Sequence, residues 1–154
     1  MRLTHKLFAG LLMILLLAGG GMAQAGDASH RTADGKLKVL YHIDGNDVGT
    51  AKYAMKLIQK HMEAEGGPDK IDIKVVVHGP ALHLFEKESI DPALLKGLSE
   101  VIGKGVKPEM CQVSMKLFNR PLDTLAPGFK GTEHPVAVKR IADLQADGYL
   151  YIKP

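Results

Sequence analysis

The fold follows most directly from residues 71–78, which read IDIKVVVH. The three consecutive valines at 75–77 place apolar side chains on both sides of this segment, and their β-branched side chains favour an extended backbone. A strand that is apolar on both sides is typical of a parallel sheet covered by helices on both faces. Residues 36–43, KLKVLYHI, have a similar composition and predict a further buried strand. The two segments therefore predict strands of one parallel sheet.

Helical patterns alternate with these strands. Residues 48–65 repeat apolar side chains at helical spacing, and the preceding segment 44–47, DGND, supplies a turn and an amino-terminal cap. Asp91 and Pro92 predict the start of a second helix, which ends at Gly103 or Gly105. The remaining predictions are a weaker strand over 106–113, a short helix over 114–119, a short strand near Phe129, a helix opened by Pro135 with an apolar stripe of Val138, Ile141 and Leu144, and a last strand over 149–153.

This alternation predicts an α/β fold, a three-layer α/β/α sandwich with a mostly parallel sheet of about five strands joined by right-handed crossovers. In such sheets, ligands bind outside the carboxyl ends of the strands. The rule selects the loops 44–47 and 78–80 and the segment around Cys111. The candidate substrate-binding or supporting residues in these loops are Asp44, Asn46, His78 and Gly79.

The amino terminus has the three parts of a secretory signal peptide. Arg2 and Lys6 give a basic start, Leu7–Leu17 is almost wholly apolar, and the segment ending at Ala25 has the small-x-small pattern of a cleavage site. The alternative is an uncleaved membrane anchor, but the apolar run is shorter than the roughly 20 residues that a spanning helix needs. We therefore expect a periplasmic or secreted protein that is cleaved after Ala25 and has no membrane contact after cleavage. The predicted organisation is a signal peptide at 1–25, a flexible leader at 26–35 and one domain at 36–154.

The charge of the chain gives little reason to expect a nucleic-acid partner. The formal net charge is +3, and two of the basic residues, Arg2 and Lys6, belong to the predicted signal. The mature protein is therefore close to neutral, and no block of Lys and Arg marks a nucleic-acid surface.

Cys111 is the only cysteine, so an exported form has no internal disulfide. Several familiar sites are excluded, because Met55 stands where a calcium loop needs glutamate and no Cys-x-x-Cys, dinucleotide or Walker pattern occurs. A cysteine just before a helix is acidified, and His78 closes the neighbouring strand, which predicts an accessible, acidic thiol. The alternative is a buried cysteine that acts as a small hydrophobic residue.

Two other functions remain open from the residues alone. One is a non-catalytic small-molecule-binding or oligomeric assembly module that uses a strand-end pocket near Asp44 and His78. The other is a periplasmic protein for a soft metal such as Cu(I), which prefers thioether, thiolate and imidazole ligands. Its candidate ligands are Met110, Cys111, Met115, His78 and His83. No resident cofactor is predicted, and His42 and His61 are interpreted as structural or solvent-facing.

Three segments carry a resemblance to a known family: VVVHGPAL at 75–82, Gly105-Val106 leading to Cys111, and RIADLQ at 140–145 running into GYLYIKP at 148–154. On these residues, which span nearly all of the domain, the chain resembles the DsrE/DsrF-like family, in particular its small exported branch. The resemblance implies an α/β/α sandwich and assembly into homo-oligomers, often trimers or hexamers. It also implies that Cys111 accepts sulfur as a persulfide from a donor protein, within a sulfur-relay or sulfur-oxidation pathway. Such a protein is closer to a carrier than to a turnover enzyme.

The chain departs from the family pattern at two points. Residues 129–134, FKGTEH, are polar where relatives have a valine-rich fourth strand. The well-studied relays are cytoplasmic, whereas export places a lone thiol in an oxidising compartment. These departures bear on the fourth strand and on the redox state of Cys111.

Overall fold

The computed structural model describes residues 29–154. The predicted signal peptide and its cleavage site lie outside the described residues. None of the helices in the described part of the chain is both long enough and apolar enough to cross a membrane.

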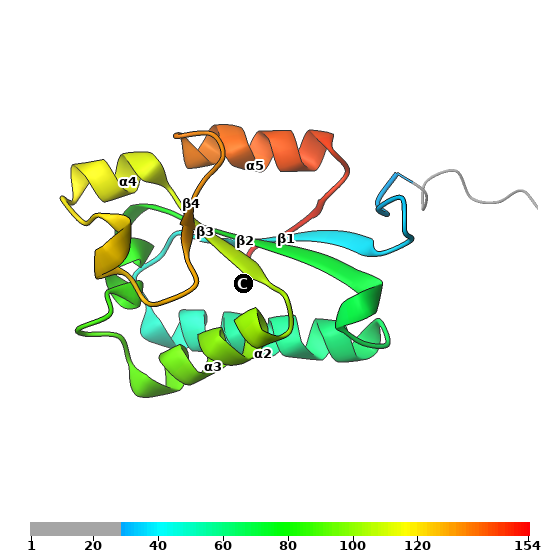
Figure 1. Ribbon diagram of the computed structural model, residues 1–154, viewed down its shortest axis with the longest axis horizontal. Coiled ribbons are helices and arrows are strands. Elements are labelled where there is room, and N and C mark those ends of the chain that lie inside the picture. Colours follow the sequence, from blue (N-terminus) through cyan, green and yellow to red (C-terminus); the bar gives the residue numbers. More distant parts are fainter. Residues whose placement is uncertain (1–28) are drawn as a thin grey trace, which may run out of the picture.

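A parallel sheet of five strands runs through the middle of the molecule (Figure 1). The strands lie in the order β4-β3-β2-β1-β5, and every neighbouring pair is parallel. Their bounds are β1 (Leu37–Ile43), β2 (Ile71–Val77), β3 (Lys107–Met110), β4 (Lys130–Gly131) and β5 (Leu150–Ile152). The two segments that predicted a parallel sheet thus form its adjacent inner strands β1 and β2.

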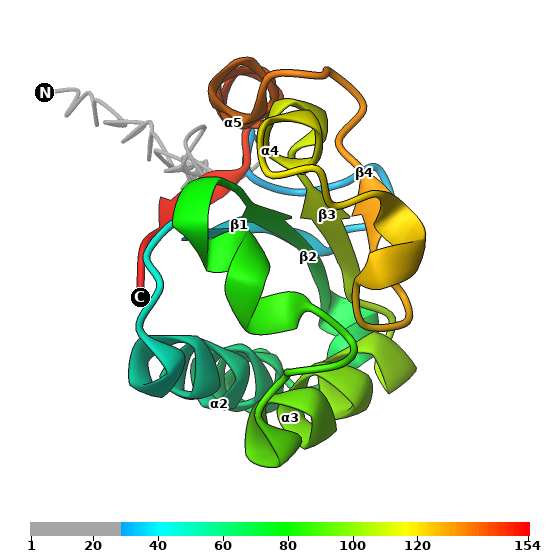
Figure 2. The same cartoon turned by 90° about the vertical axis from the view of Figure 1, so that its left-hand side faces the viewer.

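Helices cover both faces of this sheet. Helices α2 (Val48–Ala64) and α3 (Pro92–Gly103) lie together on one face, and α4 (Gln112–Leu117) and α5 (Ala137–Ala146) lie on the other (Figures 1 and 2). Short 3-10 helices connect them at η1 (Pro68–Lys70), η2 (Gly79–Phe85) and η3 (Leu122–Thr124). The predicted three-layer α/β/α sandwich is therefore confirmed.

The starts of α2 and α3 follow the predicted capping chemistry. The Asp47 carboxylate accepts a hydrogen bond from the Thr50 backbone N–H, and the Asp91 carboxylate accepts two, from Ala93 and Leu94. Each carboxylate satisfies backbone donors that have no partner within the helix.

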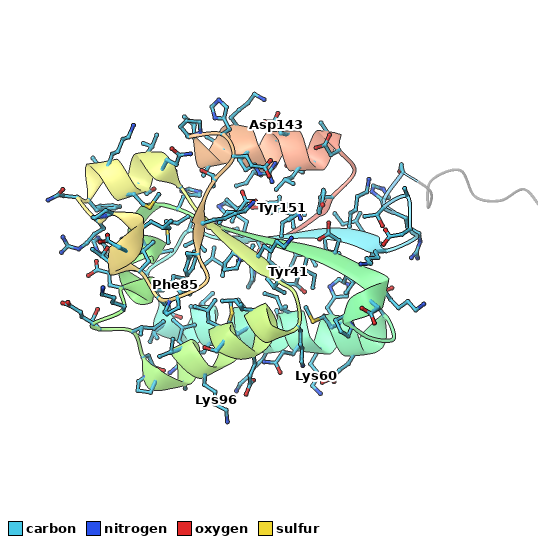
Figure 3. All side chains as sticks on the ribbon, viewed as in Figure 1. Tyr41, Lys60, Phe85, Lys96, Asp143 and Tyr151 are labelled. Carbon is cyan, nitrogen blue, oxygen red and sulfur yellow. The ribbon has the colours of Figure 1, made fainter. Side chains whose placement is uncertain are left out.

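The sheet separates two apolar cores of unequal size. Side chains alternate along a strand, so Tyr41 of β1 points toward α2 and α3 while His42 points toward the opposite face. Figure 3 shows Tyr41 and Tyr151 on opposite sides of the sheet. The larger core fills the space between the sheet and α2 and α3. The smaller core lies under α5 and contains Leu40, Val76, Cys111, Ala137, Ile141 and Leu144.

The third strand is shorter than predicted. It ends at Met110, so Cys111 is not a strand residue but the residue that precedes α4, which begins at Gln112. The short helix therefore starts two residues earlier than its predicted range of 114–119. The Cys111 backbone N–H still donates to the Val77 carbonyl of β2 at 2.9 Å, and the chain then turns directly into the helix.

The predicted stripe of the last helix is wrong at Val138, which is 63% exposed. The helix begins at Ala137 rather than at Pro135, and it turns Ala137, Arg140, Ile141 and Leu144 toward the sheet. Arg140 is drawn inward because its guanidinium donates two hydrogen bonds of 2.9 Å to the Glu109 carboxylate, which is fully buried in β3. A buried carboxylate needs such a partner, and here it decides the face of α5 that packs.

The polar segment at 129–134 still supplies a fourth strand, although one of only two residues, Lys130–Gly131. Lys130 reaches the same Glu109 carboxylate at 3.4 Å, and Glu133 reaches Arg140 at 2.6 Å. Charged side chains therefore hold this edge where valines were expected from the family.

Residues 29–35 belong to the segment predicted as a flexible leader, and they are held against the sheet by hydrogen bonds. The Lys38 backbone N–H donates to the His30 carbonyl at 2.8 Å, and the His30 ring contacts the Gly148 carbonyl at 2.8 Å. The start of β1 and the turn before β5 both have main-chain groups that need partners, which explains why this polar segment is ordered.

Candidate functional site

The three loops selected from the sequence meet at one edge of the sheet. Asp44 follows β1, His78 follows β2 and Cys111 follows β3, and the carboxyl ends of parallel neighbouring strands lie side by side. The His78 backbone N–H donates to the Ile43 carbonyl at 3.1 Å, which extends the β1–β2 ladder to this edge.

Two histidines face each other at the ends of β1 and β2. Their Nε2 atoms are 2.8 Å apart, and the planes of the two rings differ by 20°. The other ring nitrogen of His42, Nδ1, lies 2.6 Å from the Tyr151 hydroxyl of β5. The Asp44 carboxylate lies 3.8 Å from His42 Nε2 and accepts a hydrogen bond of 2.8 Å from Lys153. We refer to His42, Asp44 and His78 as the strand-end cluster.

The surroundings keep both imidazoles of the cluster neutral. Burial lowers the pKa of His42, and the nearby His78 and Lys153 lower it further, against the opposing effect of Asp44. Burial also lowers the pKa of His78 from its ordinary value. The hydrogen bond from Lys153 lowers the pKa of Asp44, so this side chain is a carboxylate. At neutral pH the cluster therefore offers two neutral imidazoles and one anion.

Cys111 lies in the smaller core, and only 4% of its surface is exposed, so the prediction of an accessible thiol is wrong for this structure. Its thiol donates a hydrogen bond to the Pro135 carbonyl, with Sγ and O 3.6 Å apart. Burial opposes ionisation and is the largest single influence on the pKa of the thiol. Hydrogen bonds from the Ser114 hydroxyl and backbone, with those from the backbones of Ala137 and Val113, outweigh it and lower the pKa below its ordinary value.

A serine connects the thiol to the neighbouring loop. The Ser114 hydroxyl accepts a hydrogen bond of 2.8 Å from the Gly79 backbone N–H and is also a hydrogen-bond partner of Cys111. Gly79 has a φ of +60°, a conformation that side chains with a Cβ rarely adopt. Glycine at this position thus lets the chain turn sharply after His78 and present its N–H to α4.

The candidate residues from the sequence are not all brought together. Asp44 and His78 belong to the strand-end cluster, and Gly79 reaches Cys111 through Ser114. Asn46 lies exposed in the loop between β1 and α2 and is not among the residues around the cluster.

The residues proposed for a soft metal are separated. Met110 is buried in the larger core, on the face of the sheet opposite Cys111. His83 lies on η2, where its ring contacts Phe118 and its Nδ1 lies 2.6 Å from the Glu86 carboxylate. These positions do not form one ligand set.

Sequence reasoning missed four residues of this region: His42, Ser114, Tyr151 and Lys153. A signal was present, because His42 and Asp44 are two residues apart in an extended segment and therefore share a face, as do Tyr151 and Lys153. A pocket of about 200 Å³ opens beside His42 and Asp44 and is also lined by Thr50, Lys153 and Pro154.

The fold and the strand-end residues define a small α/β protein with a five-stranded parallel sheet and one cysteine at a strand end. The chain belongs to the DsrE/DsrF-like family, whose model matches residues 38–154. The resemblance read from the sequence is thereby confirmed. No curated protein matches the chain by sequence.

Solved structures with the same fold are distant in sequence. The protein of unknown function MTH1491 from Methanobacterium thermoautotrophicum has 22% identity and a TM-score of 0.66, over 75% of this chain and 97% of that one. The ychN protein from E. coli has 11% identity and a TM-score of 0.58, over 76% and 98% of the two chains. BT1422 from Bacteroides thetaiotaomicron, also of unknown function, has 12% identity and a TM-score of 0.51, over 75% and 94%. At these identities the likeness extends to the fold alone.

Proposed function

We propose that this protein is an exported sulfur carrier in which Cys111 accepts a sulfur atom as a persulfide. The observation that carries the proposal is the set of hydrogen-bond donors around Sγ, which lowers the pKa of the thiol despite its burial. The thiolate is the nucleophile of sulfur exchange, so a depressed pKa favours this chemistry over a purely structural role.

The transfer step needs only a thiolate and a loaded donor. The Cys111 thiolate attacks the outer sulfur of a donor persulfide, the sulfur–sulfur bond of the donor breaks, and the donor leaves as a thiolate. One sulfur atom moves, the proton on it is retained, and no external oxidant or reductant is consumed.

Access to the sulfur is coupled to its ionisation. The protonated thiol donates to the Pro135 carbonyl, and a thiolate has no proton for that bond and is repelled by the carbonyl oxygen. Pro135 lies in the segment 133–136, which is exposed to solvent. Loss of the proton therefore removes one of two hydrogen bonds to the Pro135 carbonyl, the other being the 3.2 Å bond from the Val113 N–H, and we expect this loosening to help a donor reach the sulfur.

Homo-oligomer formation, as a trimer or hexamer, is part of the proposal. Apolar side chains in or next to helices α4 and α5 and strand β5 are exposed. These are Val113, Leu117, Val136, Val138 and Leu150. Exposed apolar surface of this kind is typical of contacts between subunits, and light scattering of the purified protein gives the mass that tests it.

Intact-mass spectrometry tests the carrier function directly, because Cys111 is the only thiol. The reduced protein is treated with polysulfide, and the proposal expects a gain of about 32 Da for one sulfur atom. The Cys111→Ser variant is the matched control and gains nothing. A native protein that gains no sulfur, and whose thiol is alkylated only after unfolding, would refute the carrier function.

A further inference from the structure

The strand-end cluster has a feature that sulfur transfer by Cys111 does not use. Within residues 29–154, the ligand atoms of His42, Asp44 and His78 all lie within 4.8 Å of one another. We propose that this cluster is a binding site for a divalent transition-metal ion of the Zn²⁺ class.

The separation of the two imidazoles suits a shared cation. Zinc–nitrogen bonds of about 2.0–2.1 Å place two ligand nitrogens about 3.3 Å apart in a tetrahedral site. The two Nε2 atoms are 2.8 Å apart, so the rings need to part by only about 0.5 Å for an ion bound at that geometry. Two histidines and one carboxylate are a common zinc-ligand set, with a fourth position left for water or substrate.

The backbone holds the cluster in place before any ion binds. His42 lies within β1, His78 directly follows β2, and these two strands pair along seven successive residues. The site therefore lies on the most extensively paired part of the sheet, and little conformational entropy is lost when an ion binds.

A second contact orients His42 for ligation. Its Nδ1 lies 2.6 Å from the Tyr151 hydroxyl. When Nδ1 carries the proton and donates it to that oxygen, Nε2 has a free lone pair directed at His78 and Asp44. A hydrogen bond on the far nitrogen is the usual support of a metal-binding histidine.

Lys153 is the group that competes with the ion. Its ammonium group donates to Asp44 at 2.8 Å, and its side chain is 52% exposed. An arriving cation must share or displace this contact, and the Lys153 side chain is free to swing into solvent. The pocket beside His42 and Asp44 provides the route of entry.

The test is Zn²⁺ binding by the chelator-treated protein, measured against a chromophoric chelator. Loss of a group that only orients a ligand costs about 10–100-fold in affinity, so His42→Ala and His78→Ala should each cost about 100-fold or more. His83→Ala is the matched control, because His83 is an exposed histidine outside the cluster, and it should leave the affinity unchanged. The proposal is overturned if the native protein binds no Zn²⁺, or if His83→Ala loses as much Zn²⁺ affinity as the two cluster variants.

Two variants remain informative if the histidine variants fail to fold. Asp44→Asn should weaken Zn²⁺ binding, whereas Lys153→Met should tighten it by about two- to fivefold, as expected for removal of one exposed ion pair. A merely structural role for these side chains predicts no such opposite effects, and equal affinities in the two variants contradict the site.

The optical spectrum of the Co²⁺-substituted protein separates this site from Cys111. Ligation by the cluster gives weak visible bands without sulfur-to-cobalt charge transfer, and Cys111→Ser leaves the spectrum unchanged. A charge-transfer band that disappears in Cys111→Ser instead assigns the ion to the thiolate and refutes the cluster.

Discussion

The face of the sheet under α2 and α3 buries a continuous apolar core, whereas the face under α4 and α5 buries charged and reactive side chains among fewer apolar ones. On the first face, Val39, Tyr41 and Val77 belong to one large apolar cluster, and the Tyr41 hydroxyl at its margin lies 3.0 Å from His61 Nδ1. On the second, His42, Glu109 and Cys111 are buried close to the strand ends. The two faces are formed by the same strands, so alternate residues of one strand pack in the apolar core and contribute to the polar strand-end site.

This difference separates the stability of the fold from the chemistry of the site. Burial of apolar side chains is the main favourable contribution to folding, and the larger core supplies most of it. Buried polar groups contribute little net stability but fix specific geometry when they are fully paired. On the upper face in Figure 1, away from the buried Glu109–Arg140 pair, substitutions should therefore alter chemistry with smaller effects on the fold.

Phe85→Ala tests how much the larger apolar core contributes to stability. Phe85 is fully buried, and its ring packs edge-on against Phe129 with centroids 5.2 Å apart. The cavity should reduce the free energy of unfolding by about 3–5 kcal/mol, measured by urea denaturation. Lys96→Ala, at a side chain of α3 that is 79% exposed, is the control and should change it by less than about 0.5 kcal/mol. Similar losses in both variants contradict the assignment of the larger core.

Arg140→Met tests the buried ion pair on the opposite face of the sheet. It leaves the fully buried Glu109 carboxylate with only the half-exposed Lys130 as a charged partner at 3.4 Å. The expected loss in the free energy of unfolding is about 3 kcal/mol, the lower end for breaking a buried ion pair.

The double variant Glu109→Leu with Arg140→Met should recover much of that loss, since no buried charge is left unpaired. Thermal and urea denaturation of the single and double variants provide the measurement. A double variant as unstable as Arg140→Met alone would show that the pair contributes packing rather than charge compensation.

Ser114→Ala tests the chemistry of Cys111, and we expect it to have the smallest effect on the fold of the three substitutions. The hydroxyl lowers the pKa of the Cys111 thiol, so its removal should raise that pKa. Because the thiolate is the reactive form, the rate of alkylation rises with pH and levels off above the pKa. The variant should reach half of its maximal rate at a higher pH than the native protein, with a rate about fivefold lower at neutral pH, the effect of losing about 1 kcal/mol of hydrogen bonding. Superimposable pH profiles for the two proteins rule out this role of Ser114.

The sequence was sufficient for the parts of the fold with long, regular patterns. Strands β1 and β2 and helices α2 and α3 lie within one or two residues of their predicted bounds, because their apolar spacing and capping residues are local signals. The orientation of α5 was not predictable in this way. Arg140 faces inward only because Glu109, 31 residues away, is buried beneath it.

The candidate site shows the same limit. Asp44 and His78 were found because they follow strands, a position that a topological rule selects. His42 was not, because its spacing of two residues from Asp44 is the same whether the histidine is structural or functional. Its importance depends on His78 and Tyr151, which only the folded sheet brings to its two ring nitrogens.

The Ser114 hydroxyl has one proton and sits between two partners. The Gly79 amide occupies an acceptor position of its oxygen, which polarises the O–H group and leaves its proton for the sulfur of Cys111. The acidity of the thiol is then thermodynamically linked to the conformation of the loop after His78. Such linkage is reciprocal: whatever fixes that loop changes the affinity of Cys111 for its proton, and sulfur bound at Cys111 changes the stability of the loop by the same free energy.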